Sequence, residues 1–305
     1  MANALTAKCR HFRLLLITSQ IFSLHMRFSQ KLVLQLVRTK FTVWSTFSKK
    51  KAARKAFELF CTPQHRNRKE LPRIFTEAEV IRFPFHKHNI QGYRWQKGGT
   101  RKVLILHGFE SSVVNFDRYV RPLLRKGYEV LAFDAPGHGR STGRQINVQV
   151  YKEFIMHLYQ TYGPIQSFMA HSLGGLSLSM ALEELPHDED TRVALIAPAT
   201  ETTTAIDSYF RFLKLEDDVR VELDALIKKI SGQDPEWFSV ARVVPHLKAQ
   251  VLWAHDRDDH MTPISDVEPV MRQGYAHVQF MMTEGLGHRR IYRDNNVTKA
   301  VVAFL

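Results

Sequence analysis

Short runs of consecutive apolar residues recur through the later two thirds of the chain, separated by longer segments with helical spacing. Such runs are typical of strands buried on both faces of a sheet, because none of their side chains meets water. They lie at residues 102–107, 128–133, 166–171, 192–197, 250–255 and 277–282. The helical segments between them predict right-handed crossovers, and therefore an α/β fold with a mainly parallel sheet flanked by helices.

Two segments depart from this alternation. Residues 80–85 and 92–96 are joined by a polar turn and predict an antiparallel hairpin ahead of the first parallel strand. Residues 200–246 contain three helical stretches and no strand, which predicts a small helical cap over the strand ends. We therefore expect the α/β domain to span residues 74–305, with the cap at about 200–246.

Residues 1–73 form a separate N-terminal arm in this interpretation. From about residue 32 to residue 60, apolar residues recur at three- and four-residue spacing with Lys and Arg between them, which predicts one or two basic amphipathic helices. No uninterrupted apolar run approaches the roughly 18–20 residues that a transmembrane helix needs. Residues 1–25 show no recognisable pattern, so Met26 is an alternative start.

The distribution of charged residues also distinguishes residues 1–73 from the rest of the chain. The 305-residue sequence has 43 basic and 30 acidic side chains, a formal net charge of +13. Residues 1–73 hold 16 of the bases and only two acids, Glu58 and Glu70, so the remainder is close to neutral. A basic protein suggests nucleic-acid binding, but the body has no basic stripe, and we expect no nucleic-acid partner.

The arm has two interpretations. In the first, its helices pack on the domain and its lysines are solvated. In the second, residues 1–60 contact a membrane peripherally, which cationic and aromatic content favours, and a cytoplasmic protein would then lie at the inner membrane face. Only Cys9 and Cys61 are present, so neither a disulfide framework nor a cysteine metal site is expected.

The most informative stretch is 165–176, where an apolar strand stops at His171 and a helix-forming run begins directly after it. Ser172 therefore lies at a strand-to-helix corner, with helix N-terminal N–H groups beside its hydroxyl. The usual pattern is small-x-Ser-x-Gly, because the tight turn excludes bulky side chains two residues either side. Ala170 and Gly174 occupy these positions.

Four other motifs each follow a predicted strand. They are His107-Gly108-Phe109, the loop 134–141 (DAPGHGRS), the segment 255–263 (HDRDDHMTP) and the segment 285–289 (GLGHR). With the Ser172 corner they resemble the α/β-hydrolase superfamily over about residues 75–305, including uncharacterised bacterial hydrolases of the esterase and lipase type. The order Ser, Asp, His is the one expected for that fold. One departure is Asp256, where the family typically has Gly.

The chemistry of such a site assigns each role. A serine hydroxyl is a poor nucleophile until a neighbouring imidazole takes its proton, so we assign Ser172 as nucleophile and His288 as general base and then acid. A carboxylate must hold the other imidazole N–H. We prefer Asp259, the last carboxylate before Met-Thr-Pro, with Asp256 and Asp258 as competitors.

A tetrahedral oxyanion needs two fixed donors. We assign them to the backbone N–H groups of Phe109 and Leu173, each of which is typically worth about 3 kcal/mol of barrier. Glu110, beside this loop, is expected either to be exposed or to face the pocket and select against acidic substrates. The nearby histidines, His107, His138 and His171, are expected to brace loops and pack rather than react.

No cofactor is expected. Asp256, Asp258, Asp259 and His260 resemble a metal cluster, but four adjacent residues cannot easily converge on one ion, so we expect no metal site. The predicted function is a serine hydrolase that cleaves a small-molecule carboxylic ester through an acyl-enzyme on Ser172. The alternatives are a thioesterase or other acyl hydrolase of the same fold, and a catalytically idle, membrane-associated scaffold.

Overall fold

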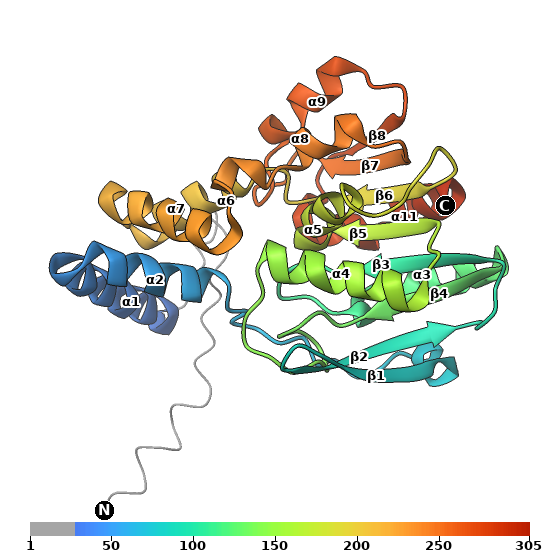
Figure 1. Cartoon of the computed structure of the whole chain (residues 1–305), viewed down its shortest axis with the longest axis horizontal. Coiled ribbons are helices and arrows are strands. Elements are labelled where there is room, and N and C mark those ends of the chain that lie inside the picture. Colours follow the sequence, from blue (N-terminus) through green and yellow to red (C-terminus); the bar gives the residue numbers. More distant parts are fainter. Residues whose placement is uncertain (1–27) are drawn as a thin grey trace, which may run out of the picture.

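The computed structural model describes residues 28–305, so the alternative start at Met26 lies outside the described residues (Figure 1). One eight-stranded sheet has the strand order β1-β2-β4-β3-β5-β6-β7-β8. The strands are β1 (Glu79–Phe85), β2 (His88–Trp95), β3 (Arg101–Leu106), β4 (Tyr128–Phe133), β5 (Ser167–His171), β6 (Arg192–Ile196), β7 (Gln250–Asp256) and β8 (Val278–Thr283). The predicted mainly parallel sheet is confirmed, because every pairing from β4 to β8 in this order is parallel.

The antiparallel part of the sheet is the hairpin β1–β2, whose second strand also pairs with β4 antiparallel. β1 lies at the edge of the sheet, and this position accommodates Pro84, since an edge strand leaves one side of its backbone unpaired. The central strands β3 to β6 are almost wholly buried, as their continuous apolar runs predict.

Helices cover both faces of the sheet, as Figure 1 shows. One face packs against α3 (Asp117–Arg125) and α11 (Asn295–Phe304). The other packs against α4 (Val148–Tyr162), α5 (Leu173–Leu182), α8 (Val240–Val243) and α9 (Glu268–Gln273). The chain therefore has the α/β-hydrolase arrangement expected of it. The short helices are η2 (Arg73–Glu77), η3 (Val113–Phe116), η4 (Pro235–Trp237), η5 (Val244–His246), η6 (Ile264–Asp266), α10 (Gly287–Arg290) and η7 (Ile291–Arg293).

Two helical segments are α-helical over only part of their length. The segment 115–126 begins with the 3-10 turn η3 and becomes α-helical only at Asp117. The segment 237–243 is α-helical only from Val240, because Pro235 leads a 3-10 turn and the Ser239 side chain accepts the N–H of Arg242, which caps the short helix α8.

The helical excursion between β6 and β7 contains α6 (Thr202–Leu213) and α7 (Asp217–Ser231). The arm contains α1 (Phe28–Phe47) and α2 (Lys49–Phe60), and the Ser48 side chain caps α2 by accepting the N–H of Lys51. These four helices lie together beyond one end of the sheet (Figure 1). Among residues 28–305, no helix is long and apolar enough to cross a membrane.

The arm packs against the helices of the cap. Three small side chains of α2, Ala52, Ala53 and Ala56, are fully buried, which permits close approach to α7. The ion pair of Lys49 with Glu216 lies at the same contact. Helix α1 adds a hydrogen bond from the Arg38 guanidinium to the carbonyl oxygen of Phe212, 2.6 Å away. For α1 and α2, the structure therefore matches the interpretation of helices packed on the domain.

Candidate active site

The backbone at Ser172 has the strained conformation of a sharp strand-to-helix turn. Its φ of 53° and ψ of −124° lie outside the regions that non-glycine residues ordinarily adopt. A Cβ at Gly174 would lie 2.7 Å from the carbonyl oxygen of His107, and one at Gly175 would lie 2.8 Å from Pro198. The turn therefore requires glycine on its helical side, whereas Ala170 is accommodated as a buried residue of β5.

The structure brings Ser172, His288 and Asp259 together, although they are far apart in the sequence. The Ser172 Oγ lies 2.9 Å from His288 Nε2, and His288 Nδ1 lies 2.8 Å from Asp259 Oδ2. All three side chains are buried. Because a carboxylate only accepts, Nδ1 carries the proton and Nε2 accepts the serine hydroxyl. This tautomer is the one a general base needs.

Asp259 is held by the loop that follows it. Its Oδ1 accepts the N–H groups of Met261 and Thr262, and its Oδ2 accepts the Thr262 hydroxyl at 2.7 Å. Burial would raise the pKa of Asp259, but the charge of His288 and these hydrogen bonds outweigh burial and hold the pKa well below its usual range. Asp259 is thus an ionised carboxylate aimed at the imidazole.

We expect replacement of Asp259 by Asn to destabilise the fold more at neutral pH than in acid. The depressed folded-state pKa means that ionised Asp259 contributes stability above the unfolded pKa of about 3.9. That contribution is lost as pH falls through the folded-state pKa. Urea unfolding of both proteins at pH 7 and in increasing acid measures the difference, which should narrow below about pH 4. A difference that widens in acid would contradict this expectation.

Asp256 and Asp258, the other two candidates for the acid, bind backbone N–H groups of the loop before His288. Asp256 accepts the N–H groups of Leu286 and Gly287 and the Thr283 hydroxyl, so it braces the loop that carries His288. Asp258 accepts the Gly285 N–H at 2.8 Å. Neither contacts the imidazole of His288 in the structure. The Asp256 side chain explains why this loop departs from the usual Gly: its carboxylate organises the histidine loop.

The loop after β3 is braced by His107. Its Nδ1–H donates to the Gly108 carbonyl oxygen at 2.8 Å, and its Nε2 accepts the Ala135 N–H at 3.0 Å. Burial lowers the pKa of His107, which fits a neutral ring with one donor and one acceptor. A Cβ at Gly108 would lie 2.8 Å from Ser172 Cβ, so only glycine lets this loop approach the serine so closely.

Phe109 and Leu173 both line the space in front of Ser172. The backbone N–H groups of both residues are free of hydrogen bonds to other residues of the described chain. Leu173 is the first residue of α5, and the first N–H groups of a helix have no partner within it. Both N–H groups are thus free to bind a negatively charged oxygen.

His171, the residue before Ser172, contacts His288. Its Nε2–H donates to the carbonyl oxygen of His288 at 3.0 Å, and the two rings pack with centroids 4.8 Å apart. Burial holds the pKa of His171 well below its usual value, so the ring is neutral. The sequence interpretation of packing beneath the corner did not foresee the hydrogen bond to the histidine loop.

Glu110 has neither of the two roles expected of it. It is half-buried beside the oxyanion loop and outside the pocket lining, and its Oε1 accepts the N–H groups of Gln64 and His65 at 2.8 and 3.2 Å. Its own N–H donates to Nε2 of His138. Glu110 therefore joins the linker after α2 to the loop that carries Phe109. Nothing in the sequence marks this contact, because its two sides lie 45 residues apart.

Replacement of Glu110 by Ala should lower the free energy of unfolding by about 1–3 kcal/mol, because the two linker N–H groups lose a charged acceptor. Glu110→Gln keeps one side-chain carbonyl oxygen and should cost less. Denaturant unfolding of the three proteins measures both effects. Equal stability of wild type and Glu110→Ala would show that the carboxylate does not hold the linker.

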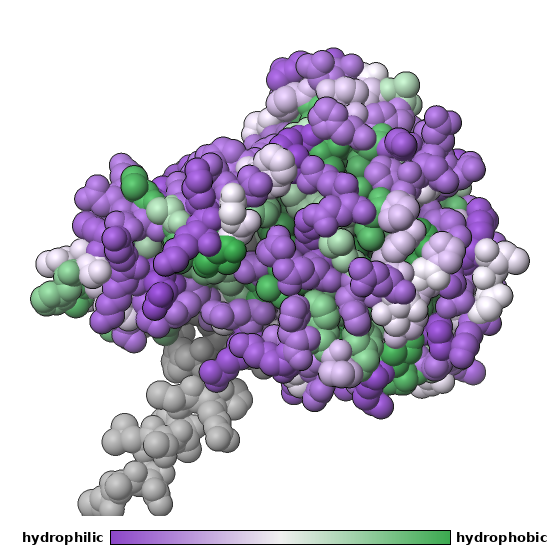
Figure 2. Space-filling model, in the orientation of Figure 1, coloured by the Kyte–Doolittle hydropathy of each residue, from purple (hydrophilic) through white to green (hydrophobic). Residues whose placement is uncertain are grey.

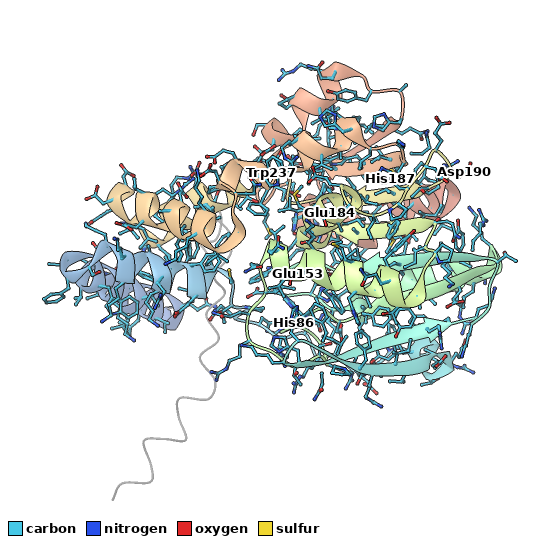
Figure 3. All side chains as sticks on the ribbon, viewed as in Figure 1. His86, Glu153, Glu184, His187, Asp190 and Trp237 are labelled. Carbon is cyan, nitrogen blue, oxygen red and sulfur yellow. The ribbon has the colours of Figure 1, made fainter. Side chains whose placement is uncertain are left out.

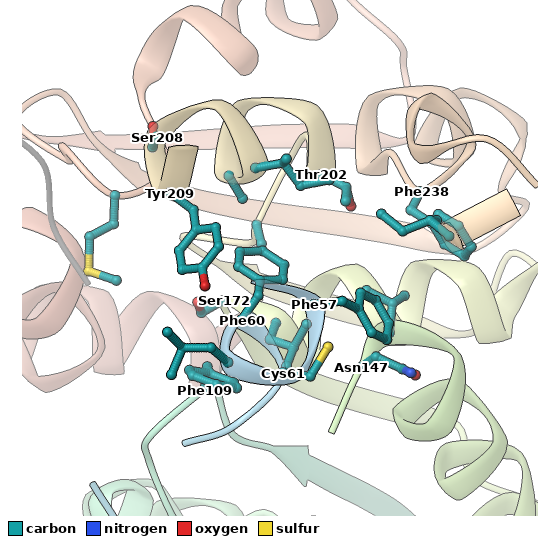
Figure 4. A pocket seen from close by; sticks show the side chains of 18 of the residues that line it. Phe57, Phe60, Cys61, Phe109, Asn147, Ser172, Thr202, Ser208, Tyr209 and Phe238 are labelled. Carbon is teal, nitrogen blue, oxygen red and sulfur yellow. The ribbon is translucent and has the colours of Figure 1, made fainter. Parts of the chain in front are cut away.

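A pocket of about 230 Å³ opens in front of Ser172 and extends between the arm and the cap (Figure 4). Its walls are predominantly apolar, and three helices of the arm and the cap supply much of them. They include Phe57, Leu59 and Phe60 of α2, Ala205, Tyr209 and Phe212 of α6, and Ile227 and Ile230 of α7. The sequence predicts a cap over the strand ends but gives no sign that α2 of the arm supplies one wall of this pocket.

Several titratable residues away from the pocket form ion pairs with oppositely charged neighbours. His86 lies 3.3 Å from Glu153 (Figure 3). Lys152 pairs with Glu184. Within residues 28–305 there is no group of three His, Cys, Asp or Glu residues arranged to hold a metal ion. Cys61, a free thiol, is buried and lines the pocket, and burial raises its pKa to about 12.

The sequence is similar to that of known hydrolases over part of its length. The sequence model of the family described as serine aminopeptidase, S33, matches residues 99–240. That match includes Ser172 and the loop that carries Phe109, while Asp259 and His288 lie beyond it. The uncharacterized hydrolase YugF of Bacillus subtilis is 32% identical over 112 residues, which are 35% of this chain and 41% of the relative. The chain thus matches less than half the length of this curated relative.

Solved structures share the fold. An esterase from Pyrococcus furiosus superposes with a TM-score of 0.57 at 21% identity, covering 80% of this chain and 97% of the esterase. A membrane phospholipase A described as a bacterial virulence factor has a TM-score of 0.57 at 16% identity, covering 90% of this chain and 96% of that one. At these identities the likeness concerns the fold.

Proposed function

Because the chain is an α/β hydrolase, we propose that it cleaves carboxylic esters through an acyl-enzyme on Ser172. The observation that carries the proposal is the buried hydrogen-bonded series from Ser172 through His288 to Asp259. A nucleophile, a base in the correct tautomer and an ionised acid are the three groups that acyl transfer needs.

The proposed reaction has two stages. The Ser172 Oγ attacks the carbonyl carbon while Nε2 of His288 takes its proton, and the negatively charged oxygen binds the N–H groups of Phe109 and Leu173. The carbon–oxygen bond to the alcohol then breaks, and Nε2 returns the proton to the leaving oxygen. In the second stage His288 takes a proton from the water that attacks the acyl carbon. The bond from that carbon to Ser172 Oγ then breaks, Nε2 returns the proton to Oγ, and the acid is released.

Labelling with a fluorophosphonate probe tests this proposal. The probe should label the wild-type protein and fail to label Ser172→Ala. The matched control is Ser208→Ala, since Ser208 is a second serine of the pocket and lies on α6. If the folded wild-type protein is not labelled, the assignment of Ser172 as a nucleophile is refuted, and the catalytically idle scaffold remains as the alternative.

The pocket favours substrates with an apolar acyl group. Phe57 and Tyr209 contribute apolar surface around the space in front of the serine (Figure 4), and Ile227 also lines the pocket. Burying apolar surface contributes about 25 cal/mol for each Å², so a longer acyl chain should bind more tightly. A thioester with the same acyl group would use the same serine. Comparing matched ester and thioester substrates distinguishes the thioesterase alternative.

We expect Ala205→Phe to shift the preference of the enzyme toward short acyl chains. Ala205 lies on α6 in the pocket wall, and a phenyl ring there would occupy volume that a long chain needs. In a series of p-nitrophenyl esters, kcat/KM should fall by about tenfold or more for long chains. Turnover of the acetate serves as the internal control and should change little. Equal losses for all chain lengths would contradict a role of this wall in acyl binding.

A peripheral membrane contact through residues 1–60 is also proposed, because the basic excess of the chain is concentrated there. A cytoplasmic location at the inner membrane face stays a prediction from that charge. Nucleic-acid binding is not favoured, since the body of the protein is close to neutral.

A further inference from the structure

One face of α1 exposes a stripe of large apolar side chains. Leu32, Leu36, Val43 and Phe47 are 54%, 55%, 48% and 84% exposed. Their spacing of four, seven and four residues places them within about 60° of the helix circumference. The opposite face, with Leu34 and Phe41, is buried in the contact with the cap. Helix α1 is therefore apolar on two opposite sides, and only one of them is covered by the described chain.

The polar residues beside the stripe do not need water for their hydroxyl groups. Thr39, Thr42 and Thr46 each donate the hydroxyl to the backbone carbonyl oxygen four residues earlier, at 2.9 to 3.1 Å. A threonine with its hydroxyl bonded in this way presents mainly its methyl group outward. The exposed face of α1 is thus less polar than its sequence suggests.

The charged side chains that α1 and the first turns of α2 themselves carry are all positive. Helix α1 contains no acidic residue, and its Lys31 and Lys40 are exposed. Lys50, Lys51 and Arg54 are exposed on the first turns of α2. These five bases form no ion pair with any residue in the described range 28–305, in contrast to Lys49, which pairs with Glu216. Long basic side chains can extend from an apolar surface toward anions.

We propose that the exposed face of α1 docks on the surface of an anionic phospholipid bilayer. Leu32, Leu36, Val43 and Phe47 enter the boundary between headgroups and acyl chains, and the lysines contact the phosphates. An apolar stripe flanked by bases is the pattern of a helix lying in the plane of an interface. This inference narrows the proposed contact of residues 1–60 to one helix face and does not depend on the Ser172 chemistry.

Charge complementarity selects the bilayer over other occupants. A second copy of the chain would bring Lys31 and Lys40 against bases of its partner in a symmetric contact, which like charges oppose. A nucleic acid would satisfy the lysines but leave the leucines and Phe47 against phosphates. Figure 2 shows apolar residues among hydrophilic ones at the outer end of the helical arm.

Sedimentation of the full-length protein with vesicles tests the proposal. Vesicles of phosphatidylcholine alone are compared with vesicles that also contain phosphatidylglycerol. The wild type should bind the anionic vesicles. Leu36→Glu combined with Phe47→Glu should weaken binding by about tenfold or more, because two inserted side chains become charged. Lys31→Glu with Lys40→Glu should weaken binding to anionic vesicles by about tenfold, with little effect on neutral ones.

The matched control is Val221→Glu on α7, another highly exposed apolar residue in the same group of helices, and it should leave vesicle binding unchanged. Circular dichroism and hydrolysis of a water-soluble ester establish that each variant is folded. If Val221→Glu weakens binding as much as the α1 pair, or neither α1 pair weakens it, the face is not the docking surface. Loss of self-association in the Leu36/Phe47 pair without vesicle binding would assign the face to a second copy.

Retention of DNA in place of anionic vesicles would also overturn the proposal. The two proposals fail separately. Vesicle binding without any ester hydrolysis would refute the proposed hydrolase and leave the docking surface standing. Ester hydrolysis without vesicle binding would refute the docking surface and leave the proposed hydrolase standing.

Discussion

Ester hydrolysis by Ser172→Ala should fall on the order of a million-fold, while the protein stays folded. No other hydroxyl lies within hydrogen-bond distance of Nε2 of His288 in the described chain, so no neighbouring group can replace the lost nucleophile. Alanine also removes the demand for a polar partner at this buried position. The kcat of p-nitrophenyl ester hydrolysis measures the effect.

Two controls make this result specific. Ser208→Ala, in the same pocket, should keep its turnover, and thermal unfolding should show that Ser172→Ala is folded. Since Ser172 has a positive φ of 53°, glycine at this position should relieve backbone strain and be equally inactive. Turnover unchanged in Ser172→Ala would overturn the mechanism.

Asp259→Asn should lower kcat about 10⁴-fold with little change in the fold at the site. Oδ1 of this residue accepts the N–H groups of Met261 and Thr262, so the amide oxygen of an asparagine takes that position. The amide nitrogen then faces Nδ1 of His288 and donates to it. The imidazole must carry its proton on Nε2, where it can no longer accept the serine hydroxyl.

Asp258→Asn is the matched control, since Asp258 only accepts the Gly285 N–H and should keep activity within about twofold. Asp256→Asn should disturb the histidine loop and reduce both activity and stability, because Asp256 accepts two N–H groups of that loop. Full activity in Asp259→Asn, with activity lost in Asp256→Asn, would make Asp256 the acid.

Much of the fold could be predicted because each buried strand has a continuous apolar run and each reactive residue follows such a run. Ser172 directly follows β5 and Asp259 lies just beyond β7. The carboxyl ends of parallel strands meet at one edge of the sheet, so residues distant in sequence were expected to converge there. The sequence favoured Asp259 over Asp256 and Asp258 only by its place before Met-Thr-Pro, whereas the contact of its carboxylate with His288 is visible only in the structure.

The contacts of the arm could not be predicted. The apolar spacing of α2 indicates that one of its faces is buried, but no periodicity states which surface covers it. Its partner, α7, lies more than 150 residues later in the chain. The same limit applies to Glu110 and to the Thr262 hydroxyl, whose roles depend on loops that meet only in the folded protein.

The shared wall of the pocket has a consequence for how the molecule folds. The bonds that hold the arm join Lys49 to Glu216 and Arg38 to Phe212, which are 167 and 174 residues apart. Such contacts close very long loops, so their entropic cost is met only after the intervening sheet has formed. The sheet, with the candidate residues Ser172, His288 and Asp259 at its edge, should therefore form first, and the pocket between the arm and the cap should be the last part of the protein to reach its native shape.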